Sequence, residues 1–177
     1  MLVVPQFAVA SFTLTYLVHQ RHWDAAVAGR WVFAFQAAGA VGRIVSGVWS
    51  DRVRSRLRPM RQLAVMSAAL MLLIALGAAL GQWWIVLGFA FGAVITVADN
   101  GLAYVSVAEF AGSAWSGRAL GVQNTLQNVA AIATAPVLAA VIGESRYAAA
   151  FLLAAIFPVI AIASTPVRAE KRVSAPV

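Results

Sequence analysis

The stretch GVWSDRVRSRLRPMR, residues 47–61, places one aspartate and five arginines between two long apolar segments. The rest of the chain explains why this cluster stands out. Of 177 residues, 62% are hydrophobic and only 11% are charged, and the mean hydropathy is +0.85. Such a chain has too few polar residues to cover a water-soluble globule of its size. The composition therefore indicates a membrane protein.

Six apolar segments are about 20 residues long or longer, the length that an α-helix needs to cross a hydrocarbon core of about 30 Å. Gly81 and Gly143 fit helix ends, and Pro59 fits a break between two helices. We expect an all-α membrane protein in which residues 1–167 form one six-helix bundle and residues 168–177 form a cytoplasmic tail. The expected spans lie near 1–18, 25–49, 62–80, 83–109, 118–141 and 147–165.

The basic residues are distributed unequally between the two sides of this expected bundle. If the loop after the second span faces the cytoplasm, nine basic residues lie on that side and only Arg21 and Arg146 lie opposite. This bias satisfies the positive-inside rule and predicts a multi-pass protein of the cell (inner) membrane with both termini cytoplasmic. An arginine cluster of this kind can also act simply as an anchor on lipid phosphates. The nine are Arg52, Arg54, Arg56, Arg58, Arg61, Arg118, Arg168, Lys171 and Arg172.

The order of residues in the cluster adds information that charge does not. Gly47, three further residues, Asp51-Arg52 and then alternate arginines resemble the signature loop of the major facilitator superfamily, which follows the second helix of each six-helix half. The family usually has glycine where this chain has Arg54. Glu109 with the later segment GRALG, residues 117–121, is similar to the family's junction between its tenth and eleventh helices. The resemblance covers the whole chain as the second half of a twelve-helix protein.

This resemblance implies a secondary transporter that moves a small solute by alternating access, with the six helices arranged as a 3+3 inverted repeat. The chain would be a C-terminal half or fragment whose partner is a missing N-terminal six-helix half or a second copy. A half-size transporter acting as a homodimer and a six-helix binding or assembly protein are the alternatives. The loop residues that would change partners during the cycle are Gly47, Asp51, Arg52, Arg54 and Arg56.

The segment TVADNGLAY, residues 96–104, places an acid close to the middle of the fourth span. A carboxylate at that depth costs about 2.5–3.5 kcal/mol on insertion scales, so Asp99 should face protein or water and not lipid. We predict a role in the solute or proton pathway, with a buried structural acid as the alternative. Helical spacing puts it on a stripe of small or polar residues, which can line a cavity or pack closely: Gly88, Gly92, Thr96, Asp99, Ala103 and Ser106.

Other polar residues within the spans are weaker candidates for the pathway. Asn100 follows Asp99, while Gln6, Thr13 and Tyr16 share a broad face of the first span. The family resemblance implies that the first and fourth helices line the central cavity; hydrogen bonding between helices is the alternative. The fifth span opens with GVQNTLQN, in which two amide pairs at i,i+4 spacing predict packing against the missing half, with a position at the cytoplasmic mouth as the alternative. These pairs are Gln123 with Gln127 and Asn124 with Asn128.

Several other classes of function lack the residues they need. The chain has no cysteine, no P-loop, no nucleophile elbow and no glycine-rich dinucleotide turn, so we predict neither an enzyme nor a cofactor. His19, His22 and Asp24 lack a fourth ligand, so no metal site is expected. The arginines lie between apolar segments, a placement that does not favour nucleic acid. Arg43, inside the second span, is a candidate anion-binding or ion-pairing residue, with snorkelling towards the interface as the alternative.

Overall fold

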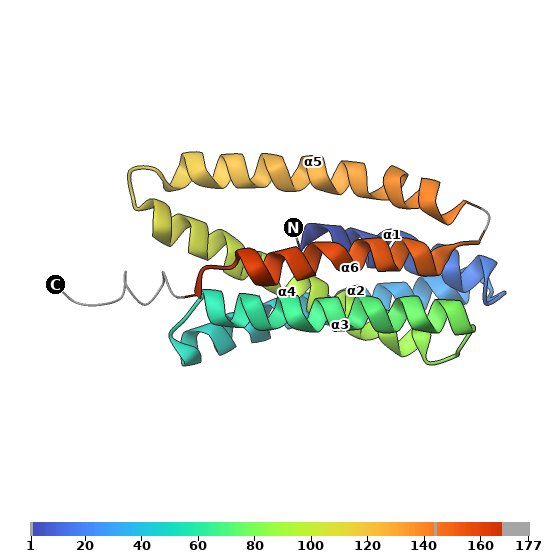
Figure 1. The fold of residues 1–177 in the computed structure, drawn as a ribbon. Coiled ribbons are helices and arrows are strands. Elements are labelled where there is room, and N and C mark those ends of the chain that lie inside the picture. Colours follow the sequence, from blue (N-terminus) through green and yellow to red (C-terminus); the bar gives the residue numbers. More distant parts are fainter. Residues whose placement is uncertain (1, 144, 168–177) are drawn as a thin grey trace.

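Six α-helices make up the computed structural model of the chain, which describes residues 2–143 and 145–167 (Figure 1). No strand occurs in these residues, so the predicted all-α fold is confirmed. The predicted tail, residues 168–177, lies outside the described residues. The helices are α1 (Val3–His19), α2 (Ala25–Val53), α3 (Leu57–Leu80), α4 (Ile85–Ala111), α5 (Ser116–Ile142) and α6 (Tyr147–Ser164).

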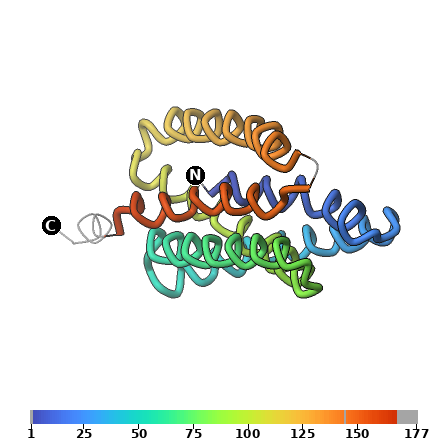
Figure 2. Tube along the Cα trace, turned by 45° about the vertical axis from the view of Figure 1, so that its right-hand side comes forward, coloured from blue at the N-terminus to red at the C-terminus, as the bar shows by residue number. Residues whose placement is uncertain are grey.

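The helices differ in their ability to cross a membrane. By length and composition, the five helices α2 to α6 qualify as spans. Helix α1 is equally apolar but has only 17 residues, which at a rise of 1.5 Å each reach about 25 Å. In Figures 1 and 2 its N-terminal end lies about halfway along the bundle, so α1 borders only part of the length of α5.

The arginine-rich stretch is more helical than expected. Helix α2 continues to Val53 and α3 begins at Leu57, so only residues 54–56 connect them. The expected break at Pro59 is wrong, because Pro59 lies in the first turn of α3. A proline there sacrifices no intrahelical hydrogen bond, since the first N–H groups of a helix have no partner within it.

The connection turns at Arg54, which caps α2 in the left-handed conformation with φ 51° and ψ 43°. Its backbone N–H donates to the carbonyl oxygens of Ser50 and Asp51. This conformation favours glycine and costs other residues about 1–2 kcal/mol. The tight turn therefore forms with arginine at a position where the signature loop of the family usually has glycine.

The helices pack into a dense group with one helix set apart. Helix α3 lies along α6 and against α4, while α1 lies among α4, α5 and α6. In Figures 1 and 2, α5 runs along one edge of the bundle with a visible separation over much of its length. An aromatic cluster fills the core between α1, α4 and α6, with ring centroids 5.2–5.6 Å apart: Tyr16, Phe89, Tyr147 and Phe151.

Helices α2 and α4 approach each other closely, and we call their contact the α2–α4 seam. A Cβ atom added to Gly39 would lie 2.6 Å from the carbonyl oxygen of Ala93, and one added to Gly42 would lie 2.8 Å from Cγ1 of Val94. Ser46 completes the seam by donating a 2.6 Å hydrogen bond to the carbonyl oxygen of Ala98. Small residues let the two backbones approach, as in many membrane helix pairs.

Candidate functional site

Helix α4 carries two consecutive polar residues that face different openings. Asp99 and Asn100 are adjacent in sequence and therefore point about 100° apart around the helix. Asp99 lines a large cavity, whereas Asn100 lines a separate small cleft. The sequence led us to expect one pathway, but the structure divides its central residues between two openings.

The large opening, the Asp99 cavity, has a volume of about 760 Å³ and mostly apolar walls. It lies over Leu2 and Val3 at the beginning of α1, and Asp99 at its wall is only 5% exposed. Such a volume accommodates many water molecules or a solute. Helices α3, α4, α5 and α6 supply further lining residues, among them Met60, Ala103, Gln123, Gln127 and Ala161.

Two hydrogen-bond acceptors at this cavity have no side-chain donor. Within residues 2–143 and 145–167, the Asp99 carboxylate makes neither a side-chain hydrogen bond nor an ion pair. The Oε1 atom of Gln123 is buried and also lacks a donor. A buried polar group without a partner costs roughly 1–3 kcal/mol, and a charged one costs more. The cavity therefore favours an occupant that donates hydrogen bonds, whether water, a proton on the carboxyl group or a solute.

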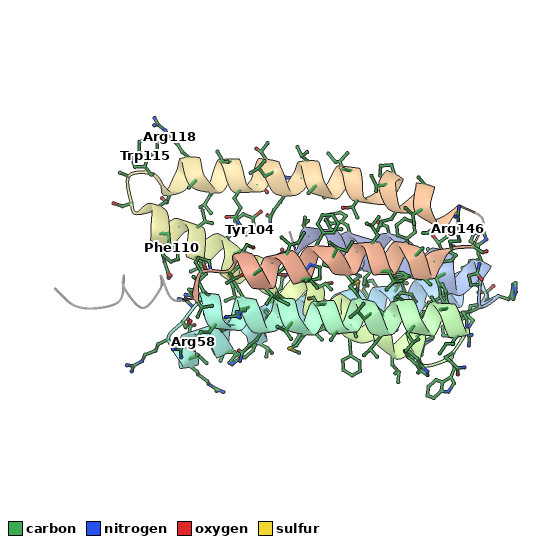
Figure 3. All side chains as sticks on the ribbon, in the orientation of Figure 1. Arg58, Tyr104, Phe110, Trp115, Arg118 and Arg146 are labelled. Carbon is green, nitrogen blue, oxygen red and sulfur yellow. The ribbon has the colours of Figure 1, made fainter. Side chains whose placement is uncertain are left out.

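The small opening, the polar cleft, lies between α1, α4 and α5 and has a volume of about 150 Å³. Asn100 Nδ2 donates to Gln6 Oε1 at 2.9 Å, which joins α4 to α1. The Tyr104 hydroxyl donates to Asn124 Oδ1 at 2.9 Å, which joins α4 to α5, and Figure 3 shows Tyr104 between these two helices. The polar residues of the cleft are Gln6, Asn100, Tyr104, Asn124, Gln127 and Asn128.

Three predicted pathway residues are in the core and reach neither opening. Thr13 and Thr96 are buried and donate to the carbonyl oxygens of Val9 and Gly92, four residues earlier in their own helices. A threonine hydroxyl often satisfies itself in this way, so its presence in a span does not imply a cavity. Tyr16 is part of the buried aromatic cluster.

The predicted small-residue stripe of α4 is mainly a packing face. A Cβ atom on Gly88 would lie 2.9 Å from Ile74 of α3, and one on Gly92 would lie 3.1 Å from Val9 of α1. Ser106 is buried and bonds within α4. Asp99 and Ala103 are the members of the stripe that line a cavity.

The loop between α2 and α3 is organised by Arg56. Its Nη1 donates to Asp51 Oδ1 at 2.5 Å and to Ser50 Oγ at 3.0 Å, and its Nε donates to Glu109 Oε1 at 3.3 Å. One guanidinium thus joins the C-terminal end of α2 to that of α4. The hydrogen bond to Asp51, with a smaller contribution from Glu109, raises the pKa of Arg56 above its ordinary value. Arg56 therefore stays charged at any physiological pH.

The other predicted loop residues lie apart from this network. Arg52 and Arg54 are exposed, and Gly47 is half-buried with open space where a side chain would project. Arg43 is exposed and forms no ion pair with any residue in the described part of the chain. Ser50 and Ser55 also organise this loop, and the sequence analysis missed both. Ser50 Oγ donates to the carbonyl oxygen of Ser55, and Ser55 Oγ accepts from the N–H of Arg58 at the start of α3.

Two further features concern charged or metal-ligating side chains. Asp24 accepts hydrogen bonds from the N–H groups of Ala26 and Val27 and so caps α2. Among the described residues, no group of three or more histidine, cysteine or acidic side chains is arranged to hold a metal ion. Tyr104 was also missed as a site residue. Its spacing from Asn100 by one helical turn was the available signal.

Comparison with known proteins gives a consistent result. The family model described as Major Facilitator Superfamily matches residues 1–175. Two proteins of Mycobacterium tuberculosis, from strains CDC 1551 / Oshkosh and H37Rv, are each described as an uncharacterized MFS-type transporter. Each is 40% identical to the chain over 168 residues, which is 95% of the chain and 38% of the relative. The chain thus spans 38% of the length of these relatives. No solved structure gives a significant match.

Proposed function

The chain belongs to the major facilitator superfamily, a family of transporters and not of enzymes, and we propose that it forms the C-terminal six-helix half of a secondary transporter. In this proposal the complete protein moves a small solute across a membrane by alternating access. The observation that carries it is the pair of neighbouring openings along α4, which bring Asp99 and Asn100 into contact with cavities inside an apolar bundle. Lipid bilayer and solute are the partners that follow.

Asp99 is the residue that we assign to ion coupling. A buried carboxylate that forms no ion pair or hydrogen bond with another side chain of the described residues can alternate between binding and releasing a proton without breaking a side-chain network. The apolar walls of its cavity would exclude competing ions. The proton is therefore the proposed coupling ion, and the cavity is its route.

The Arg56 network is the proposed conformational latch. Its two ion pairs are partly exposed, since the side chain of Asp51 is 65% exposed and that of Glu109 is 55% exposed. Exposed pairs of this kind contribute only about 0.2–1 kcal/mol each, so one state of the cycle can hold them and the next can release them. The network would hold the loop between α2 and α3 against the end of α4 in one state only.

The orientation that we propose is both termini in the cytoplasm of a cell whose inner membrane holds the protein. Arg58 and Arg118 lie at one end of the bundle and Arg146 lies at the other, as Figure 3 shows. The positive-inside rule favours the arginine-rich end as the cytoplasmic one. Reporter fusions after Arg61 and after Arg146 should therefore report opposite sides of the membrane, and an external signal at Arg61 would reverse the assignment.

The partner that completes the transporter is a second six-helix bundle. Helices α2 and α5 carry exposed apolar side chains along their length, including Phe33, Ile44, Leu126 and Ile132. We propose that an N-terminal half covers these faces, with a homodimer of this chain as the alternative.

A chimera tests transport directly. In it, this chain replaces the matching 38% of the mycobacterial relative, and the product is reconstituted in liposomes that contain a pH-sensitive dye. Addition of a solute mixture should drive proton movement through the chimera and not through the isolated 177-residue chain. Proton movement through the isolated chain as a monomer would contradict the need for a second half, whereas flux from its dimer would favour the half-size alternative.

A further inference from the structure

The polar cleft between α1, α4 and α5 holds side chains besides Asn100 to which the transport proposal assigns no role. We propose that it is a solute-binding subsite for an uncharged molecule whose neighbouring hydroxyl or amide groups both donate and accept hydrogen bonds. This inference rests on the proposed transport function and adds the class of solute. It also assigns Tyr104, Asn124 and Asn128, which come from outside the predicted pathway, as residues that determine specificity.

The polar residues of the cleft keep hydrogen-bond donors and acceptors that are not used within the cleft. In the bond between Asn100 and Gln6, Asn100 uses one N–H and Gln6 uses its carbonyl oxygen, which leaves the Gln6 amino group and the Asn100 carbonyl oxygen available. Asn124 accepts from Tyr104 and keeps both of its donors, while Asn128 donates to the Asn124 backbone and keeps its acceptor. Donors and acceptors thus alternate across three helices, which matches a group such as hydroxyl that does both.

The described lining of the cleft carries no formal charge. Among the residues that the structure describes, every polar residue that lines the cleft is an amide or a phenol, and none is aspartate, glutamate, lysine or arginine. A charged solute entering the cleft would lose hydration without gaining an opposite charge, which is a large penalty. Asp99 and Arg118 line the Asp99 cavity and are absent from the lining of the cleft, although Val3 and Gln127 border both openings.

Hydrogen bonds across helices orient the polar groups of the cleft. The cross-helix bonds fix Gln6 against Asn100 and Tyr104 against Asn124, both at 2.9 Å. Groups held in this way lose little conformational freedom when a solute binds, so more of the interaction energy appears as affinity. The volume of about 150 Å³ suits a compact solute or one end of a larger solute.

Binding of radiolabelled probes to the chain in lipid nanodiscs tests this inference. The probes are myo-inositol and uridine, which are uncharged, choline, which is cationic, and succinate, which is anionic. We expect the uncharged probes to bind in preference, with about fivefold weaker affinity in Tyr104→Phe and in Asn124→Leu because each removes hydrogen bonds. Thr125→Val is the matched control, since Thr125 lies on α5 outside the cleft and bonds within its own helix. It should bind like the unchanged chain.

The second measurement tests whether a charge introduced into the cleft changes which probes bind. Asn124→Asp places a carboxylate in the cleft with nearly the same shape, so it should weaken inositol binding and admit choline. Preferential binding of choline or succinate by the unchanged chain would overturn the inference, as would uncharged-probe binding that Tyr104→Phe, Asn124→Leu and Asn124→Asp all leave unaltered. Failure of every uncharged probe to bind would overturn it as well. Flux of a charged solute through the chimera would overturn the solute class while leaving the transport function standing.

Discussion

Helices α2 and α5 hold equivalent places in the two helix triplets, yet they pack in opposite ways. Helix α2 meets α4 along the α2–α4 seam, where glycines bring the backbones together and Ser46 bonds across the interface. Helix α5 meets α1 and α4 across openings, and its glycines Gly117 and Gly121 have nothing within contact distance. Polar amides of α5 border these openings.

The difference separates two tasks within one bundle. A seam made of backbone contacts has almost no freedom to adjust, so α2 and α4 behave as one rigid body. A contact made of polar side chains around open volume can rearrange at small cost. Changes on the seam should therefore alter stability, and changes on the α5 side should alter transport.

The largest effect should come from breaking the seam. Gly39→Ala places a Cβ atom 2.6 Å from the carbonyl oxygen of Ala93, and a backbone atom cannot move aside. We expect the free energy of unfolding to fall by about 3 kcal/mol, measured by denaturant titration in micelles. The control is Gly121→Ala, which meets open space on α5 and should raise stability by about 0.5–1 kcal/mol. Equal effects at both positions would erase the contrast between the two helices.

Asp99→Asn should produce the largest effect on the open side. The change removes the titratable group with little change of volume, so we expect proton-coupled flux of the chimera to fall by about 100-fold. Membrane insertion and stability should be retained, because asparagine keeps the shape of the side chain and the carboxylate pairs with no other side chain of the described residues. Flux and folded yield are measured on the same preparation. Loss of protein from the membrane instead would make Asp99 a structural acid.

Arg54→Gly tests the rigid side of the molecule, at the end of α2. Arg54 holds a left-handed conformation at the end of α2 that glycine adopts without strain. We expect a gain of about 1 kcal/mol in the free energy of unfolding and unchanged solute flux. Arg52→Gly, in the last turn of the same helix, is the control and should reduce stability. A loss of stability in Arg54→Gly would mean that the arginine side chain itself holds the turn.

The smallest effect should follow from Asp51→Ala, at the loop where the rigid body meets the cytoplasmic surface. Loss of one exposed ion pair with Arg56 should change the free energy of unfolding by under about 1 kcal/mol. We expect transport to slow a few-fold while solute affinity stays the same, because the loop lies far from the cleft. Binding and flux must be measured separately, and an equal loss of both would argue against a latch.

The sequence predicted the helices well because apolar length determines a membrane span almost by itself. Their ends were less predictable. Arg52 and Arg58 are polar but helical, since a helix can extend beyond the apolar core, and Pro59 is compatible with a first turn as well as with a break. Periodicity alone does not distinguish these cases.

The candidate site was predictable in its residue types and not in its grouping. Asp99 and Asn100 were both identified, but their division between two openings depends on where α5 lies. Thr13 and Thr96 share the polarity of true lining residues, yet intrahelical hydrogen bonds satisfy them within the core. Tyr104 was overlooked because a tyrosine in a span is equally typical of packing, and its partner Asn124 comes from a helix whose orientation the sequence does not specify.

The adjacency of Asp99 and Asn100 in α4 has a mechanical consequence. Helix α4 moves together with α2 because of their seam, so any rotation of that pair that shifts Asn100 relative to the polar cleft must also shift Asp99 relative to its own cavity. Occupancy of the polar cleft would then change occupancy of the Asp99 cavity without an intervening chain of residues. By thermodynamic linkage the effect has the same size in both directions, so occupancy of either opening would change the affinity of the other by the same factor.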